Sequence, residues 1–228
     1  MSDAGSLDLP SFQGHQSLRE QVADALRAAL VAGQMRPGVT YSAPALAATF
    51  GVSATPVREA MLDLGKEGLV EAVRNKGFRV TELSERDLDE ISELRALIEV
   101  PTVGRIARHH DADAVQALRP LAHEIVDAAA RSDLITYVDA DRRFHLGLLE
   151  LAGNAHLVQV VRDLRARTRL YGLQELADAG TLPASAAEHE QLLDLVLAGD
   201  SRAAVALMRH HVAHVRAEWS GRGRPPRR

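Results

Sequence analysis

The sequence predicts a mainly α-helical protein, with an N-terminal winged helix-turn-helix (three helices plus a small β-hairpin) followed by an all-α antiparallel helical bundle. Apolar residues recur at helical spacing over most of the chain, and the only strand-like stretch is short and surrounds a tight turn. Aromatic residues make up only 4% of the chain. A core with so few aromatic rings depends on Leu, Val, Ile and Ala, a composition that favours helices.

Four segments are expected along the chain: a disordered leader over 1–14, the winged unit over 15–81, the helical unit over 82–220 and a basic tail over 221–228. The leader lacks the basic and apolar stretches of a secretory signal. No apolar run approaches the roughly 20 residues that a membrane-spanning helix requires. The chain has no cysteine, which excludes disulfides and Cys-ligated zinc. We therefore expect a cytoplasmic protein with no membrane partner.

Three helices are expected in the N-terminal unit. They are bounded by Ser17 and Gly33, by Ser42 and Gly51, and by Ser53 and Gly68. Gly51 can adopt a positive φ, and Ser53 is a typical N-cap for the third helix. Two strand-like pieces at 69–73 and 78–81 enclose the turn at 75–77 and predict the hairpin. This order of elements is that of a winged helix-turn-helix.

The rest of the chain has helical periodicity with short breaks. Helices are expected near 85–109, 111–131, 133–152, 154–179, 184–199 and 201–219. Asp111, Asp133 and Asn154 lie where N-caps belong, and Gly153 and Gly199 lie where helices end.

The net charge of −4 is unevenly distributed. Residues 15–80 carry 8 Lys or Arg against 6 Asp or Glu, whereas residues 81–220 carry 15 against 23. The acidic part is disfavoured as a nucleic-acid surface, and the N-terminal unit remains a candidate.

The run GVSATPVREAMLDLGKEGLV at 51–70 resembles the recognition stretch of the GntR family of bacterial regulators, and MRPG at 35–38 and ALA at 45–47 match the same family. The resemblance covers residues 16–81 and implies double-stranded operator DNA as the partner. The DNA-binding residues it implies are Ser53, Thr55, Arg58, Arg74, Lys76 and Gly77. Ala54 stands where the family usually has an arginine that reads guanine, so the operator is expected to differ. The alternative to DNA binding for Arg58 is a surface ion pair with Glu59 or Asp63. The alternative for Arg74 and Lys76 is that they are solvent-exposed residues of a hairpin turn with no binding role.

Three stretches resemble the FCD ligand-binding domain of the FadR-like subfamily. They are ELRALIEVPTVGRIA at 93–107, DRRFHLGLLELAGNAHL at 141–157 and EHEQLLDLVLAGDSRAAVALMRHHVAHV at 188–215. Metal-binding members of the subfamily use one aspartate and three histidines, and the matching residues are Asp141, His145, His189 and His211.

The spacing of these residues is compatible with a single site. Asp141 and His145 are four residues apart on one helix face. His189 and His211 lie at similar distances from the turn at 199–200, so two antiparallel helices would bring them together. One carboxylate and three imidazoles suit a divalent transition metal, with Zn²⁺ favoured and Ni²⁺ or Mn²⁺ as alternatives. A register shifted by one residue would replace His211 with His210, and ordinary polar helix residues are the remaining alternative.

Two arginines on apolar helix faces, Arg95 and Arg165, are candidate ligands for a small organic acid effector. The alternative for each is an exposed or interhelical ion pair. We expect a ligand-responsive transcription regulator that binds an inverted-repeat operator as a homodimer, a repressor rather than an activator by resemblance. No nucleophile or general base accompanies the metal ligands, so no catalytic residue is predicted. The rival interpretations are a helical metalloenzyme and a constitutive DNA-binding protein with a purely structural dimerisation domain.

Overall fold

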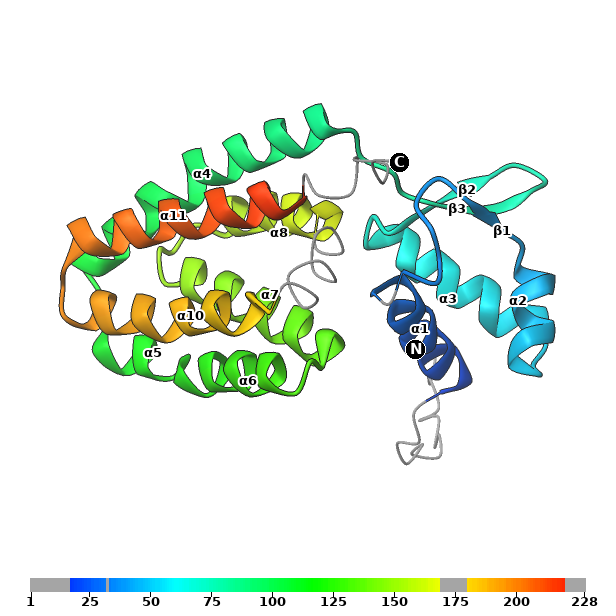
Figure 1. Ribbon diagram of the computed structural model, residues 1–228, viewed down its shortest axis with the longest axis horizontal. Helices are drawn as coiled ribbons and strands as arrows, with labels where there is room; N and C mark the ends of the chain where they lie inside the picture. The colour runs from blue at the N-terminus through cyan, green and yellow to red at the C-terminus, as the bar shows by residue number, and fades with distance from the viewer. Residues whose placement is uncertain (1–16, 32, 169–179, 220–228) are drawn as a thin grey trace, which may run out of the picture.

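The structure is a computed structural model that describes residues 17–31, 33–168 and 180–219. It contains a winged unit of three helices and a small sheet, followed by a larger helical unit (Figure 1). Each unit encloses its own cluster of buried apolar side chains. The expected leader, the expected basic tail and the expected helix beyond residue 168 lie outside the described residues.

The winged unit has three helices and three short strands, with the first strand between the first and second helices. Its elements are α1 (Leu18–Val31), β1 (Thr40–Tyr41), α2 (Ala43–Phe50), α3 (Ala54–Lys66), β2 (Val70–Val73) and β3 (Gly77–Val80). The buried face of α3 consists of Val57, Ala60, Met61 and Leu64, at the i, i+3, i+4 and i+7 spacing that places side chains on one side of a helix. This face packs on α1 and α2, so the opposite face of α3 is left exposed.

The turn between α2 and α3 depends on Gly51. Its φ of 67° is a left-handed conformation that favours glycine, and its N–H donates to the carbonyls of Ala47 and Ala48. Ser53 occupies the N-cap position of α3 with an extended backbone, but its side chain makes no capping hydrogen bond. The expectation of side-chain capping was therefore wrong, and the Ser53 side chain is exposed at the start of α3.

The predicted hairpin is present as β2 and β3, with Val70 opposite Val80 and Val73 opposite Gly77. A third strand, β1, extends the antiparallel sheet to the order β1-β3-β2. With two residues, β1 is too short for an alternating pattern, which is why the sequence did not predict it. Gly77 has a φ of 131°, and a Cβ atom there would overlap the carbonyl oxygen of Tyr41. The glycine at the wing therefore permits the close approach of β1.

The helical unit is a bundle of short and long helices. They are α4 (Glu85–Arg108), α5 (Ala112–Gln116), α6 (Arg119–Ala130), α7 (Leu134–Glu150), α8 (Ala155–Thr168), α10 (Leu182–Leu197) and α11 (Ser201–Trp219). In Figure 1, α11 runs beside α4, and α10 lies between α11 and α6. The single helix expected over 111–131 was wrong, because two helices, α5 and α6, occupy it. Pro120 explains the break, since proline has no N–H to continue a helix and is favoured in a first turn.

Glycine allows close packing of α4 on α11. A Cβ atom at Gly104 would overlap Val205, and the Ser201 hydroxyl donates to the carbonyl of Gly104 at 2.7 Å. The predicted N-caps are confirmed for Asp111, Asp133 and Asn154, whose side chains accept backbone N–H groups. Over the described residues, no helix has both the length and the apolar character needed to cross a bilayer.

Candidate metal centre and nucleic-acid interface

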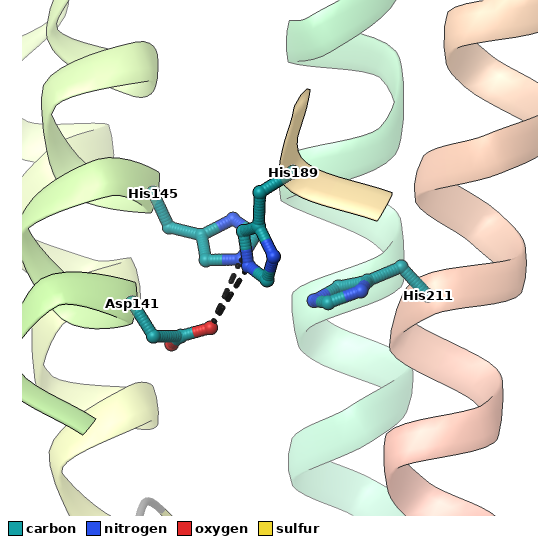
Figure 2. Close-up of side chains that lie close together, drawn as sticks. All are labelled: Asp141, His145, His189 and His211. Atoms are coloured by element: carbon teal, nitrogen blue, oxygen red, sulfur yellow. Dashed lines mark hydrogen bonds and ion pairs between the residues drawn. The ribbon is translucent and has the colours of Figure 1, made fainter. Parts of the chain in front are cut away.

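Asp141, His145, His189 and His211 lie together in the interior of the helical unit (Figure 2). Asp141 and His145 occupy successive turns of α7, His189 comes from α10 and His211 from α11. The turn at Gly199, whose φ is 70°, makes α10 and α11 antiparallel neighbours and places the His189 and His211 rings 5.0 Å apart. The structure thus brings the four predicted residues to one point, with His211 rather than His210 facing it.

Three of the four side chains bring acceptor atoms within hydrogen-bond distance of one another. Nε2 of His189 lies 3.1 Å from Oδ1 of Asp141 and 3.1 Å from Nε2 of His145. Nε2 of His145 lies 3.5 Å from the same Asp141 oxygen. Neighbouring ligand atoms at Zn–N and Zn–O lengths near 2.05 Å in a tetrahedral site are about 3.3 Å apart. The spacing of these atoms therefore fits a common divalent cation.

Hydrogen bonds at the far side of two rings leave Nε2 free to bind a metal. Nδ1 of His189 donates to the carbonyl oxygen of Ala186 at 3.0 Å, and Nδ1 of His211 donates to Oε2 of Glu188 at 2.7 Å. Because these oxygens can only accept, the ring protons reside on Nδ1 and the Nε2 lone pairs face the cluster. A hydrogen bond of this kind is the usual partner of a metal-binding histidine.

The interior position of the cluster favours the neutral form of His145 and His211 and the ionised form of Asp141. Burial lowers the pKa of His145 well below its usual range, as does the charge of Arg165. Burial likewise lowers the pKa of His211, with a further contribution from His189. Burial alone would raise the pKa of Asp141, but His145, His189 and Arg165 outweigh it and hold that pKa well below its usual range. Neutral imidazole and ionised carboxylate are the forms that bind metal ions.

Arg95 and Arg165 are both buried beside this cluster, and both contact Glu99. Nε of Arg95 lies 2.7 Å from one Glu99 oxygen, and Nη2 of Arg165 lies 2.6 Å from the other. Nη1 of Arg165 also reaches Oδ2 of Asp141 at 3.2 Å. The sequence did not single out Glu99 as a site residue, although its place four residues after Arg95 was the available signal. Arg165 therefore connects Glu99 to a candidate metal ligand.

The candidate DNA-binding residues lie at the surface of the winged unit. Thr55 and Arg58 are exposed on α3, and Arg74 and Lys76 are exposed on the turn of the wing. A hollow of about 470 Å³ lies between α2, α3 and the wing, and its lining includes Arg58, Arg74, Lys76 and Gly77. Asp63, one of the alternative partners of Arg58, instead pairs with Arg19 and Lys66. Positive side chains from α3 and the wing thus face one hollow.

Comparison with known proteins agrees with both units. Residues 18–80 match the family described as bacterial regulatory proteins, gntR family, and residues 90–214 match the FCD domain. The fold and these matches define a transcription regulator with a winged helix-turn-helix and a helical regulatory domain. The chain belongs to the GntR family and carries an FCD domain.

The relatives include both curated proteins and solved structures. A probable D-xylose utilization operon transcriptional repressor of Paenarthrobacter nicotinovorans is 28% identical over 86% of each chain. The regulator McbR of Escherichia coli K12 is 29% identical over 81% of this chain and 82% of McbR. The structure of E. coli McbR/YncC superposes with a TM-score of 0.68 at 25% identity, covering 90% of this chain and 98% of that one. A putative GntR regulator of Rhodococcus sp. RHA1 gives the same TM-score and identity over 90% and 99%. These proteins are named as regulators, not enzymes.

Proposed function

We propose that this protein is a ligand-responsive transcriptional repressor that binds an inverted-repeat operator as a homodimer and is controlled by a small carboxylate bound at a metal site in the FCD domain. The observation that carries the proposal is the convergence of Asp141 and three buried imidazoles inside the regulatory domain of a GntR-family chain. Repression is the activity named for two relatives, the D-xylose operon repressor and the E. coli repressor GlaR.

A divalent transition metal, with Zn²⁺ favoured over Ni²⁺ or Mn²⁺, would be held by Asp141, His145, His189 and His211. Three nitrogen donors and one oxygen donor suit these ions. Bound there, the metal would supply a Lewis acid for a ligand oxygen. The protein's own residues orient the rings of His189 and His211, through Ala186 and Glu188, and burial favours the neutral form of His211.

The charge balance of the interior favours an anionic effector. The positive charges of Arg95 and Arg165 balance the carboxylates of Glu99 and Asp141. Glu188, which contacts His211, adds one further carboxylate beside the group. A divalent cation would therefore leave a net positive charge in a buried region, which is unfavourable without a counter-charge. A small organic acid would supply that counter-charge. Arg165, which already contacts Asp141, is the nearer of the two candidate effector-binding arginines.

The winged unit would bind the operator through two elements. Ser53, Thr55 and Arg58 would meet the major groove at the start of α3, and Arg74, Lys76 and Gly77 would follow the backbone and minor groove at the wing. Two such units in a homodimer would meet the two halves of an inverted repeat. Ala54 removes the family's usual guanine contact and predicts an altered operator.

Helix α7 could couple the metal centre to the winged unit, because it carries residues of both regions. One face of α7 carries Asp141 and His145, while Ile135, Val138 and Arg142 of the same helix line a cleft of about 770 Å³ shared with α1 and α3. A shift of α7 on effector binding would therefore alter the support of the winged unit, with residues 81–86 as the hinge. Only a difference in effector affinity between two conformers can change DNA affinity, and such couplings are typically about 1–3 kcal/mol.

DNA binding is tested by titrating the full chain, loaded with Zn²⁺, against promoter DNA of its own gene in a gel-shift assay. Loss of one base-reading contact is worth about 1–3 kcal/mol, so Arg58→Ala should weaken binding by about tenfold or more. Arg202→Ala removes the same charge from the exposed surface of α11 and serves as the control. Equal affinities for the two variants would contradict the assignment of α3 as the recognition helix.

Effector binding is tested by a thermal-shift screen of small organic acids against the Zn²⁺-loaded chain. An effector should raise the melting temperature of the wild type and change its operator affinity, and both effects should disappear in His145→Ala. Operator binding that responds to none of the acids, with the metal in place, would refute the sensing role and leave a constitutive DNA-binding protein.

A further inference from the structure

One side chain, Arg216, joins the last turns of α11 to the first turns of α4. Its Nη2 atom donates to Oε2 of Glu85 at 2.9 Å and to the Glu85 carbonyl oxygen at 3.2 Å. Its Nε atom donates to Oδ1 of Asp89 at 2.8 Å. Glu85 and Asp89 are four residues apart, so they lie on one face of α4. A single guanidinium therefore holds two successive turns of the neighbouring helix.

The surroundings of Arg216 distinguish it from an ordinary surface arginine. Its side chain is only 14% exposed, and its guanidinium donates to three acceptors on α4. Hydrogen bonds from a charged donor are stronger than those between neutral groups. Arg86, at the same end of α4, is 87% exposed and pairs with Glu90 of its own helix. Arg216 thus joins two helices, whereas the ion pair of Arg86 stays within one.

This contact lies where the chain passes from the winged unit to the helical unit. On the winged side, the Thr81 hydroxyl donates to the carbonyl oxygen of Gly68 at 2.8 Å. On the helical side, Ser84 and Asp87 form a capping box at the start of α4. Residues 82 and 83 are the connecting segment between these two anchors. In Figure 1, the first turns of α4 and the last turns of α11 lie at the side of the helical unit nearest the winged unit.

The helix that carries Arg216 also carries a residue of the candidate metal centre. His211 lies five residues before Arg216 on α11, and its ring is 5.1 Å from that of His145 and 5.0 Å from that of His189. A cation held by α7, α10 and α11 together would fix the position of α11 within the bundle. Packed helices commonly shift by about 1–2 Å between two states of a protein. Such a shift of α11 would reach the connecting segment through Arg216.

We infer that Arg216 is a positioning residue that transmits metal binding at the candidate metal centre to the winged unit. This inference rests on the proposed function, because it requires that the metal centre influences operator binding. With Arg216 in place, the start of α4 moves with α11 and changes the angle at which residues 82 and 83 hold the winged unit. Without Arg216, α4 and α11 still pack along their length, but the start of α4 follows α11 less closely.

The restraint is tested by cleaving the full chain with a glutamate-specific protease and identifying the fragments by mass spectrometry. Cleavage after Glu82 requires the connecting segment to open, and its rate follows the population of the open form when opening is fast. Arg216→Gln removes two partly exposed ion pairs and should raise this rate by about threefold to tenfold. Arg86→Gln is the matched control and should cleave as the wild type does.

A second variant identifies the contact that is responsible. Asp89→Asn should also raise the rate of cleavage after Glu82. Added to Arg216→Gln it should have little further effect, because both changes remove the same contact and contacting residues are not additive. Circular dichroism verifies the fold of each variant.

Transmission is tested by titrating the full chain against promoter DNA of its own gene, with and without Zn²⁺. The two dissociation constants of the wild type should differ by about fivefold or more. In Arg216→Gln their ratio should move toward one, while the Zn²⁺ affinity measured by equilibrium dialysis stays at the wild-type value. Arg86→Gln should keep both the ratio and the Zn²⁺ affinity of the wild type.

The outcomes separate this role from the proposed function. Equal cleavage after Glu82 in the wild type and Arg216→Gln would overturn the restraint, and a weakened Zn²⁺ affinity in Arg216→Gln would assign the residue a structural role instead. A wild-type ratio that persists in Arg216→Gln would overturn the transmission and leave the proposed function intact. A ratio of one in the wild type would overturn the role of Arg216, and the screen of organic acids would still decide the proposed function.

Discussion

Replacement of Glu99 by glutamine should strongly destabilise the helical unit. The Glu99 side chain is 0% exposed and its two oxygens contact Arg95 and Arg165, whose side chains are 3% and 7% exposed. Glutamine keeps the size of the side chain but removes its charge. The change leaves two buried guanidinium groups, and among the described residues Asp141, which contacts Arg165, is the carboxylate that still pairs with one of them.

The size of the effect follows from the electrostatics of Glu99. Burial would raise the pKa of Glu99, but Arg165 and Arg95 outweigh burial and bring that pKa from 4.5 down to about 2. A tenfold change in a dissociation constant is worth about 1.4 kcal/mol, so the ionised form is stabilised in the folded state by about 3 kcal/mol. Removal of one partner of a buried ion pair typically costs about 3–5 kcal/mol, which agrees with the value obtained from the pKa of Glu99. The contribution is present above pH 4.5 and is lost as the pH falls toward 2.

Urea unfolding of the metal-free full chain at pH 7, followed by circular dichroism, measures this loss. Glu71→Gln is the control, because it breaks an ion pair with Arg79 in which both side chains are about half exposed. Exposed pairs contribute about 0–1 kcal/mol, so the control should unfold nearly as the wild type does. A loss for Glu99→Gln no larger than that of Glu71→Gln would refute the role of Glu99 as the buried anchor of the two arginines.

Three further predictions concern the metal, the wing and pH. Chelation should lower the melting temperature of the wild type but leave that of His145→Ala unchanged, and equal responses in calorimetry would contradict a metal held by Asp141, His145, His189 and His211. Gly77→Ala should destabilise the protein by about 1–3 kcal/mol because its Cβ would overlap Tyr41, whereas Gly33→Ala, with open space around its Cβ, should cost less in the same urea assay. The metal-free chain should lose stability as the pH falls below 6.5, because burial lowers the pKa of His145 and His211 in the folded state and the unfolded chain therefore binds more protons. Urea unfolding midpoints that do not decrease from pH 7.5 through 6.5 to 5.5 would contradict this prediction.

Regular elements were the most predictable part of the fold, because their signals are local. Helical spacing located α3 and its inward residues, and the aspartates and asparagine at helix starts marked caps that the structure confirms. The errors arose where a local signal was weak or misread. The two-residue strand β1 forms by pairing with β3, and Pro120 lies in the first turn of α6, where a new helix begins within the single helix expected over 111–131.

The convergence of Asp141, His145, His189 and His211 was predictable, because each lies within a family-like stretch and their spacing places them at similar positions along α7, α10 and α11. The side chains that contact these four residues were not predictable. Glu188 could be assigned to His211 only once α10 and α11 were in register, and the ion pairs of Glu99 join α4 to α8 across 66 residues of chain.

The sequence by itself determined the main helices and the hairpin, the family and the residue types at the candidate metal centre, because periodicity, turn residues and motif spacing are properties of neighbouring positions. Only the tertiary structure decided that Arg95 and Arg165 share Glu99, that the Ser53 side chain makes no cap, and that Glu188 contacts three histidines of α11. The reason is physical. A buried charge takes its partner from whichever helix packs against it, and helix packing depends on the side chains of the whole bundle.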